Sequence, residues 1–287
     1  MSKDRHIMEL QGKTRVVIEN GKVIEVGEPM TEYCPIFDKV RGVKKFTPGT
    51  VKENIEFRIR DFGIFTEDRE LEMEIFVGFG ASETFMTALR SGLLDTTVTV
   101  CDGTGTVITS NPKLCQGMGS RISGLTMTSP IEGLIKRVEA VDGVVLDPKT
   151  ARIDQVDGVR KALEMGYRRI GVSVATVEIL KEIRKLEEES GAEIITFGVH
   201  TTAMPKEEAD EFIELVDVTT GCTSKWIRGQ VEGKVLAQFG TGIPIFALTQ
   251  RGKALLLERA KEVTSPILVN TQKLPIQPEG KQPWPLV

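Results

Sequence analysis

Short apolar runs alternate with amphipathic stretches over most of residues 74–270. Runs such as Arg169–Val174 and Glu193–Val199 are apolar, rich in β-branched residues, and short enough for buried strands. Between them, Val177–Glu189 places its apolar side chains on one helix face and is followed by Gly191, a residue type common just after helices. Strands that alternate with helices predict a mainly parallel sheet with helices on its faces. The pattern therefore predicts an α/β fold.

Further elements follow from the same rules of spacing and capping. The other expected strands are 14–18, 22–26, 74–79, 98–101, 144–146 and 267–269, and the other expected helices are 47–63, 80–90, 156–165, 205–215 and 253–262. Asn20-Gly21 predicts a tight hairpin between the first two strands, because both residues accept positive φ. Gln116–Arg121 reads as a flexible loop. The tail from Thr271 is too rich in proline for a helix or a central strand, so it is either disordered or strapped across the body with Trp284 as an anchor.

The order of landmarks repeats along the chain. A strand that ends in Cys101 corresponds to a strand before Cys222, about 120 residues later. The flanking glycines, helices and strands recur at a nearly constant offset. This predicts a tandem duplication with two Rossmann-like halves related by a pseudo-twofold axis. The expected segments are an N-terminal β element (1–46), two α/β repeats (47–150 and 151–270) and the tail (271–287). A (βα)8-like barrel is the alternative fold, because duplicated halves also build barrels.

Composition narrows the class of protein. The 287 residues carry a net charge of −4 without a marked run of Lys or Arg, which argues against a nucleic-acid-binding surface. No apolar run approaches the ~18–20 residues of a membrane span, and the N-terminus lacks the apolar core of a secretory signal. We therefore expect a cytoplasmic protein, whose four cysteines are thiols, metal ligands or redox groups rather than disulfides.

The candidate site lies where strands end. In open α/β sheets the ligand crevice forms at the carboxyl ends of the strands, and Cys101, His200 and Cys222 all follow strands. Arg121 could bind a carboxylate or a phosphate through its guanidinium group. Backbone N–H groups near Ser82, and the glycine loops, could hold the same anion. These candidate ligand-binding glycines are Gly103, Gly105, Gly117, Gly119, Gly240 and Gly242.

Three kinds of chemistry remain open for the cysteines. Cys34, Cys101, His200 and Cys222 could ligate a soft metal or an iron–sulfur cluster, with Cys115 as another possible ligand. Two of the thiols could instead form a redox dithiol, or Cys101 and Cys222 could act as catalytic thiols beside His200. The remaining reading involves no chemistry, because cysteine is also common in buried cores.

Several blocks in combination resemble one known family. They are Thr14–Ile18, Glu32–Pro35, Asn54–Arg58, Val100–Val107, Arg121–Leu125 and Ala151–Val156. Together they are similar to the methanogenesis marker protein 8 family, over most of the chain. The resemblance implies an archaeal protein of an anaerobic cytoplasm with a tie to methyl-coenzyme M reductase, its cofactor, its activation or its coenzymes. It supplies no established catalytic residues, and it makes Cys115 the least typical of the four cysteines.

Three functions follow as hypotheses. The first is an accessory protein that aids assembly or activation of the reductase as its protein partner, with a metal or cluster at the strand ends. The second is an enzyme that acts on a small anionic coenzyme or precursor through a cysteine thiol. The third is a non-catalytic scaffold that docks partners through the proline-rich tail.

Overall fold

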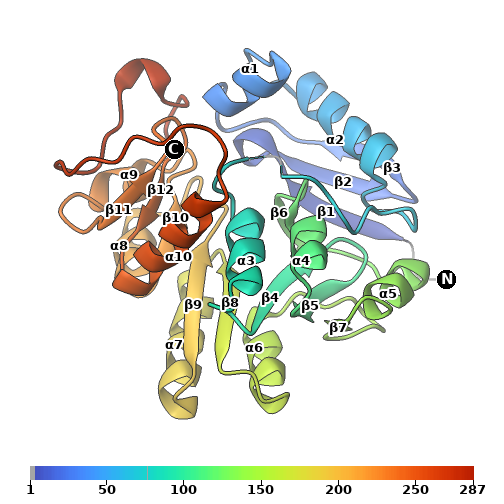
Figure 1. Cartoon of the computed structure of the whole chain (residues 1–287). Coiled ribbons are helices and arrows are strands. Elements are labelled where there is room, and N and C mark those ends of the chain that lie inside the picture. The colour runs from blue at the N-terminus through green and yellow to red at the C-terminus, as the bar shows by residue number, and fades with distance from the viewer. Residues whose placement is uncertain (1–3, 76) are drawn as a thin grey trace.

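The main sheet forms the centre of the molecule (Figure 1). The computed structural model describes residues 4–75 and 77–287. Within them the sheet has eight strands in the order β11-β12-β10-β9-β8-β4-β5-β7. Their bounds are β4 (Thr96–Cys101), β5 (Gly105–Thr109), β7 (Gly143–Val145), β8 (Arg169–Val174), β9 (Glu193–Gly198), β10 (Val218–Thr220), β11 (Ala237–Phe239) and β12 (Ile245–Ala247). β10, β9, β8 and β4 are parallel, and an antiparallel pair extends the sheet on each side.

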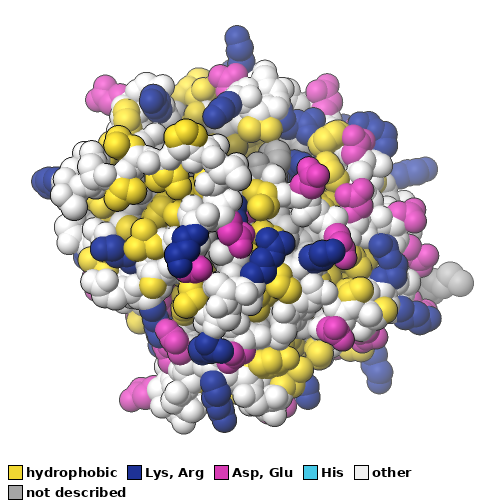
Figure 2. Space-filling model, in the orientation of Figure 1, with side chains coloured by type: hydrophobic (Ala, Val, Ile, Leu, Met, Phe, Trp, Pro, Cys, Tyr) yellow, Lys and Arg dark blue, Asp and Glu magenta, His cyan; other side chains and the backbone are white. Residues whose placement is uncertain are grey.

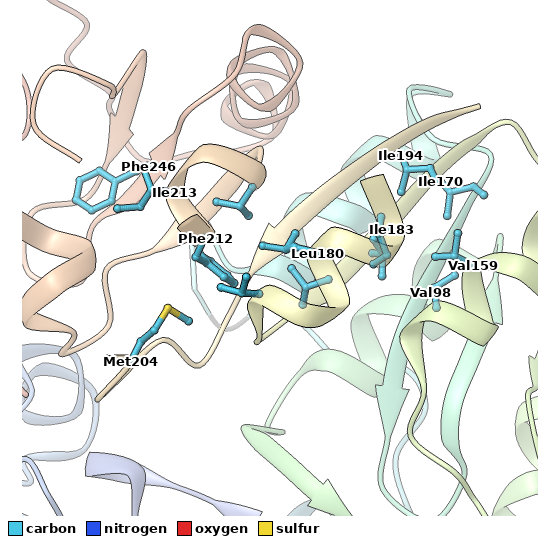
Figure 3. Packing of buried hydrophobic residues seen from close by; sticks show 14 of the residues in the cluster. Val98, Val159, Ile170, Leu180, Ile183, Ile194, Met204, Phe212, Ile213 and Phe246 are labelled. Carbon is cyan, nitrogen blue, oxygen red and sulfur yellow. The ribbon is translucent and has the colours of Figure 1, made fainter. Parts of the chain in front are cut away.

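Helices cover both faces of this sheet. One face packs against α6 (Gln155–Glu164), α7 (Val177–Ser190), α8 (Lys206–Leu215) and α9 (Lys225–Gln230). Figure 3 shows this packing, with Leu180 and Ile183 of α7 facing strand residues such as Ile170 and Ile194. The other face packs against α3 (Ala81–Arg90), α4 (Pro112–Gly119) and α10 (Gln250–Lys261), and α5 (Glu132–Glu139) packs beside β7.

A second, antiparallel sheet lies beside the first. Its order is β3-β2-β1-β6, with β1 (Arg5–Glu9), β2 (Arg15–Glu19), β3 (Lys22–Val26) and β6 (Gly124–Met127). α2 (Pro48–Phe62) packs its apolar face on this sheet, and α1 (Pro35–Arg41) precedes it. Two short 3-10 helices, η1 (Gln11–Lys13) and η2 (Glu279–Lys281), complete the elements described. Because β6 comes from the middle of the chain, its pairing with β1 ties the second sheet to the body.

The predicted α/β fold is confirmed, and so are most of its elements. The hairpin at Asn20-Gly21 forms, and α2 has the expected Thr47 cap at its start and a left-handed Gly63 at its end. The main sheet is open at β11 and β7, so the barrel alternative is wrong. The sheet has a parallel centre with antiparallel pairs at both sides, and it runs through both predicted repeats without a break.

Three local predictions differ from the structure, and one strand was not predicted. Residues 74–79 form no strand in the part described, and Phe76 lies outside the described residues. Gln116–Gly119, expected in a flexible loop, form the end of α4, because Asn111 caps that helix and Pro112 starts it. Ile267–Val269 pair with no strand and are exposed. β1 was missed, because its charged and apolar residues alternate too briefly to stand out.

The tail lies extended across the body and is not disordered, which is one of the two alternatives expected from the sequence. Trp284 stacks on Tyr33 with ring centroids 6.2 Å apart, and the Trp284 carbonyl accepts the Tyr33 N–H. Arg228 donates to the side-chain carbonyls of Gln277 and Gln282. Trp284 thus lies against the segment that leads into α1, and Val287 pairs with Thr223 and Lys225 at the start of α9.

The surface carries mixed charges. Figure 2 shows Lys and Arg interspersed with Asp and Glu over the face in view. In the part of the chain that the structure describes, no helix is both long and apolar enough to span a membrane.

Candidate functional site

A cavity of about 450 Å³ lies between the two sheets. Its floor is formed by the ends of parallel strands, including Thr99 of β4, Ser173 of β8 and the residues just after β9 and β10. The start of α3 and all residues from 119 to 126 form another side, and α1 and α2 contribute Phe37 and Phe57. The cavity therefore occupies the carboxyl edge of the sheet, where the sequence predicts a site.

Arg58 is the most unusual charged group of this cavity. It lies on α2 and is only 9% exposed. Its Nε donates to Asn54 Oδ1 (3.0 Å) and a terminal nitrogen donates to the Arg121 carbonyl (2.6 Å). None of the carboxylates described lies within ion-pair distance of it. Burial, and the positive charges of Arg121, Arg41 and Arg69, lower the pKa of Arg58 to about 9.

Two further arginines line the same cavity. Arg41 of α1 is exposed, and its guanidinium lies 4.0 Å from the centroid of the Phe57 ring. Arg121 has a left-handed backbone (φ 65°) and lies 4.5 Å from the Phe62 centroid. Burial and the charge of Arg41 lower the pKa of Arg121. Arg41, Arg58 and Arg121, here called the arginine cluster, make this end of the cavity positive.

Three buried polar side chains of the cavity each have one atom without a hydrogen-bond partner within the described structure. They are Asn54 through Nδ2, Thr99 through Oγ1 and Ser120 through Oγ. Each residue is more than nine-tenths buried. Buried polar atoms in folded proteins are normally hydrogen-bonded. Their positions therefore indicate that the cavity is built to hydrogen-bond a polar ligand.

The start of α3 brings a carboxylate to the cavity. Glu83 accepts hydrogen bonds from Ser82 Oγ (3.1 Å) and Gln116 Nε2 (3.1 Å). No side chain caps this helix, so the capping role that explains such residues elsewhere does not apply here. Gly119 packs directly on Ser82, and a Cβ there would lie 2.5 Å from the Ser82 Cβ.

His200 follows β9 and Cys222 follows β10. Both line the cavity and both have positive φ, 59° and 38°. His200 Nε2 hydrogen-bonds Glu9 across the two sheets, and its ring fills the space that a Cβ on Gly124 would need. Although burial opposes the shift, His200 holds the pKa of Glu9 below its ordinary value. Cys222 Sγ lies 3.0 Å from Thr220 Oγ1. Strained backbone in non-glycine residues is often found at functional sites.

The other cysteines are placed differently. Cys101 is fully buried in an apolar cluster, and burial together with the neighbouring Asp102 raises its pKa to about 12. Burial likewise raises the pKa of Cys115 to about 12, although this residue borders the cavity. Cys34 is buried at the start of α1, and burial raises its pKa. Among the residues described, no group of three or more His, Cys, Asp or Glu side chains could hold a metal ion. The structure thus does not gather Cys34, Cys101, His200 and Cys222 into one ligand set.

The predicted glycine loops are mostly structural. Gly103, Gly105, Gly117, Gly240 and Gly242 do not line the cavity, whereas Gly119 does. Gly105 has φ 73°, and a Cβ there would lie 2.3 Å from the Ala151 carbonyl oxygen. Gly117 lies inside α4, where a Cβ would collide with the Leu71 carbonyl. Of the remaining predicted ligand-binding residues, Ser82 and Arg121 line the cavity.

Sequence reasoning missed Arg58, Asn54 and Glu83. A signal for the first two exists in α2. Val51 and Ile55 define the apolar face of this helix, and positions 54 and 58 fall on that same face at three- and seven-residue spacing from 51. A polar residue on a buried face needs a partner, which makes it a candidate functional residue.

Comparisons with known proteins give a family. Residues 6–261 match a family described as "Uncharacterized protein conserved in archaea (DUF2099)". The chain is also 48% identical over 285 residues to "Uncharacterized protein MJ0054" of Methanocaldococcus jannaschii, covering 99% of this chain and 100% of that protein.

Proposed function

We propose that this chain, which belongs to the DUF2099 family of uncharacterised archaeal proteins, binds a small organic anion in the cavity between its two sheets. The observation that carries the proposal is Arg58, a buried guanidinium without a carboxylate partner among the residues described. A buried charge is normally paired, because removing it from water costs several kcal/mol. An anionic ligand would provide the missing partner.

The neighbours of Arg58 support the same ligand class. Arg41 and Arg121 add positive charge at the same wall, and guanidinium groups bind carboxylate and phosphate oxygens with two parallel hydrogen bonds. Asn54 Nδ2 and Ser120 Oγ could donate to the remaining oxygens of the anion. The ligand should therefore carry a carboxylate, sulfonate or phosphate group.

The rest of the cavity favours an apolar part in the same ligand. Phe37, Phe57, Phe85 and Val174 all line it. The volume of about 450 Å³ falls in the range of small-molecule sites. A free inorganic ion would leave these apolar side chains without a partner, so an organic anion fits better.

An enzymatic role is the second candidate, and Cys222 favours it. This cysteine borders the cavity with a strained backbone, whereas Cys101 is in the core. We infer that Cys222, rather than Cys101, would be the reacting thiol. The ligand would then be the small anionic coenzyme or precursor that the marker protein 8 resemblance suggests. A role beside methyl-coenzyme M reductase rests on that resemblance alone, and co-purification with the reductase is its test.

Calorimetric titration with ethyl phosphate, inorganic phosphate and propionate tests anion binding. We expect ethyl phosphate to bind more tightly than inorganic phosphate, because its ethyl group contacts the apolar wall. Arg58→Met and Arg41→Gln should each weaken the binding of ethyl phosphate by about tenfold or more, the range of a charge-assisted hydrogen bond. Arg60→Gln is the matched control, since Arg60 lies on the same helix but is exposed and paired with Asp61. The proposal would be contradicted if the unmodified protein and the three variants bound ethyl phosphate equally well, or if no anion bound.

A further inference from the structure

Glu83 is a buried carboxylate that anion binding does not explain. It is 3% exposed and lines the same cavity as the arginine cluster. No Lys, Arg or His among the residues described lies within ion-pair distance of it. Its two hydrogen-bond donors, Ser82 and Gln116, are both neutral. The cavity thus contains two kinds of buried charge, positive and negative, each without a direct counterion.

A purely structural role accounts poorly for this carboxylate. In a capping box, a Glu at the third helix position would bind the backbone N–H at the helix start, but α3 has no side-chain cap. The helix dipole does favour a negative charge at this end. That effect is small for a buried group compared with the cost of leaving it without a cation.

The local packing keeps the carboxylate in place. Glu83 Oε2 occupies the position where a Cβ on Gly80 would be, at 2.1 Å from the ideal atom. Gly80 has an ordinary extended backbone, so this position does not require glycine for its φ angle. The absence of a side chain there makes room for the carboxylate group. Gln116, which donates to the other oxygen, is itself buried in α4.

We propose that Glu83 binds an ammonium group of the ligand, so that the ligand is a small zwitterion with its anionic group at the arginine cluster. This inference depends on the proposed anion site and adds the second half of the ligand. A carboxylate buried without a cation and a guanidinium buried without an anion are both offset when one molecule carries both charges. Ligand classes of this kind are amino acids and aminoalkyl phosphates or sulfonates.

A matched pair of ligands separates the two halves of the site. Ethyl phosphate and 2-aminoethyl phosphate differ only by the ammonium group. We expect the full-length protein to bind 2-aminoethyl phosphate about tenfold more tightly, or better, as measured by calorimetric titration. Glu83→Gln should reduce this preference to about one while ethyl phosphate still binds, somewhat more tightly because a negative charge has left the cavity.

Two further variants serve as controls. Glu74→Gln removes an exposed carboxylate near the start of α3 and should keep the preference. Gly80→Ala retains the charge of Glu83 but displaces its carboxylate, and should reduce the preference as Glu83→Gln does. Circular dichroism checks that each variant is folded. If Glu83→Gln does not fold, Gly80→Ala still tests whether the preference depends on the position of the Glu83 carboxylate.

The outcomes distinguish this inference from the proposed function. If ethyl phosphate binds, but the ammonium group adds nothing and neither Glu83→Gln nor Gly80→Ala changes the ratio, the role of Glu83 is refuted and the anion site stands. If neither phosphate binds, and propionate and β-alanine also fail to bind, the anion site is refuted and the role of Glu83 falls with it.

Discussion

Replacing Arg58 with methionine should weaken anion binding by about tenfold or more, with only a small change in the stability of the ligand-free protein. The side chain is buried, so an ordinary expectation would be a large loss of stability. Its environment is unfavourable to the charge, however, because burial and three nearby guanidinium groups lower its pKa from the ordinary value of an arginine to about 9. That shift corresponds to roughly 5 kcal/mol of unfavourable free energy that the native state carries.

The hydrogen bonds of Arg58 act in the opposite direction. Methionine would leave Asn54 Oδ1 and the Arg121 carbonyl without their donor. Each buried acceptor that loses its partner costs about 1–3 kcal/mol. The gain and the loss are therefore of similar size. We expect the free energy of unfolding of Arg58→Met to lie within about 2 kcal/mol of that of the unmodified protein.

Arg69 provides the contrasting case. It is also fully buried, but its Nε donates to the buried carboxylate of Asp102 at 3.0 Å, and its Nη2 donates to backbone carbonyls at the end of α4. Arg69→Met would leave Asp102 buried and unpaired, which should cost about 3–5 kcal/mol. Urea unfolding followed by circular dichroism, without ligand, measures both variants. A loss above about 3 kcal/mol in Arg58→Met, matching Arg69→Met, would refute the reasoning and make Arg58 a structural residue.

Three other predictions concern separate parts of the chain. Iodoacetamide should alkylate Cys222 well before Cys101, because Cys101 is fully buried with a raised pKa, and peptide mass spectrometry will show the order. Burial alone would raise the pKa of Asp217, but the charges of Arg184 and Arg251 outweigh it and lower this pKa from 3.8. The ionised carboxylate therefore stabilises the folded state above pH 3.8, and this stabilisation is lost as the pH falls below that value. Acid unfolding of Asp217→Asn should therefore depend less on pH below about 4, and an unchanged acid limb would contradict this. Deleting 271–287 should lower the midpoint of thermal unfolding by at least about 2–4 °C, since the tail packs on the segment before α1; calorimetry gives the shift, and no shift would mean that the strap adds no stability.

Sequence patterns of a few residues were enough to predict most of the helices and strands. The caps of α2 and α7, at Thr47 and Thr176, and the hairpin glycine are local signals, and local signals can be read from the chain. The pairing of β6 with β1 is different. It joins residues more than a hundred positions apart, and neither strand has a strong alternating pattern. Such pairing depends on which edges are free in the folded molecule.

The candidate site was predictable in position but only partly in chemistry. The rule that ligands bind at strand ends located the cavity, and Ser82, Arg121, His200 and Cys222 line it. The cysteines could not be told apart, because a thiol in the core and a thiol on a cavity look alike in sequence. Arg58 was hidden for a related reason. No carboxylate among the described residues forms an ion pair with it, and only the three-dimensional neighbours of a charge can show this.

The difference between the two repeats marks where function should lie. The repeat relates Ile122–Thr126 to Ile245–Thr249, yet β12 pairs with β10 in the main sheet, whereas β6 pairs with β1 in the second sheet. Every residue from 119 to 126 lines the cavity, and the corresponding segment around β12 does not. The departure of β6 carries Arg121 over the strand ends and places it beside Arg58 of α2. Because only the first of these two segments lines the cavity, we expect substitutions in 119–126 to affect binding of the proposed ligand far more than substitutions in 242–249.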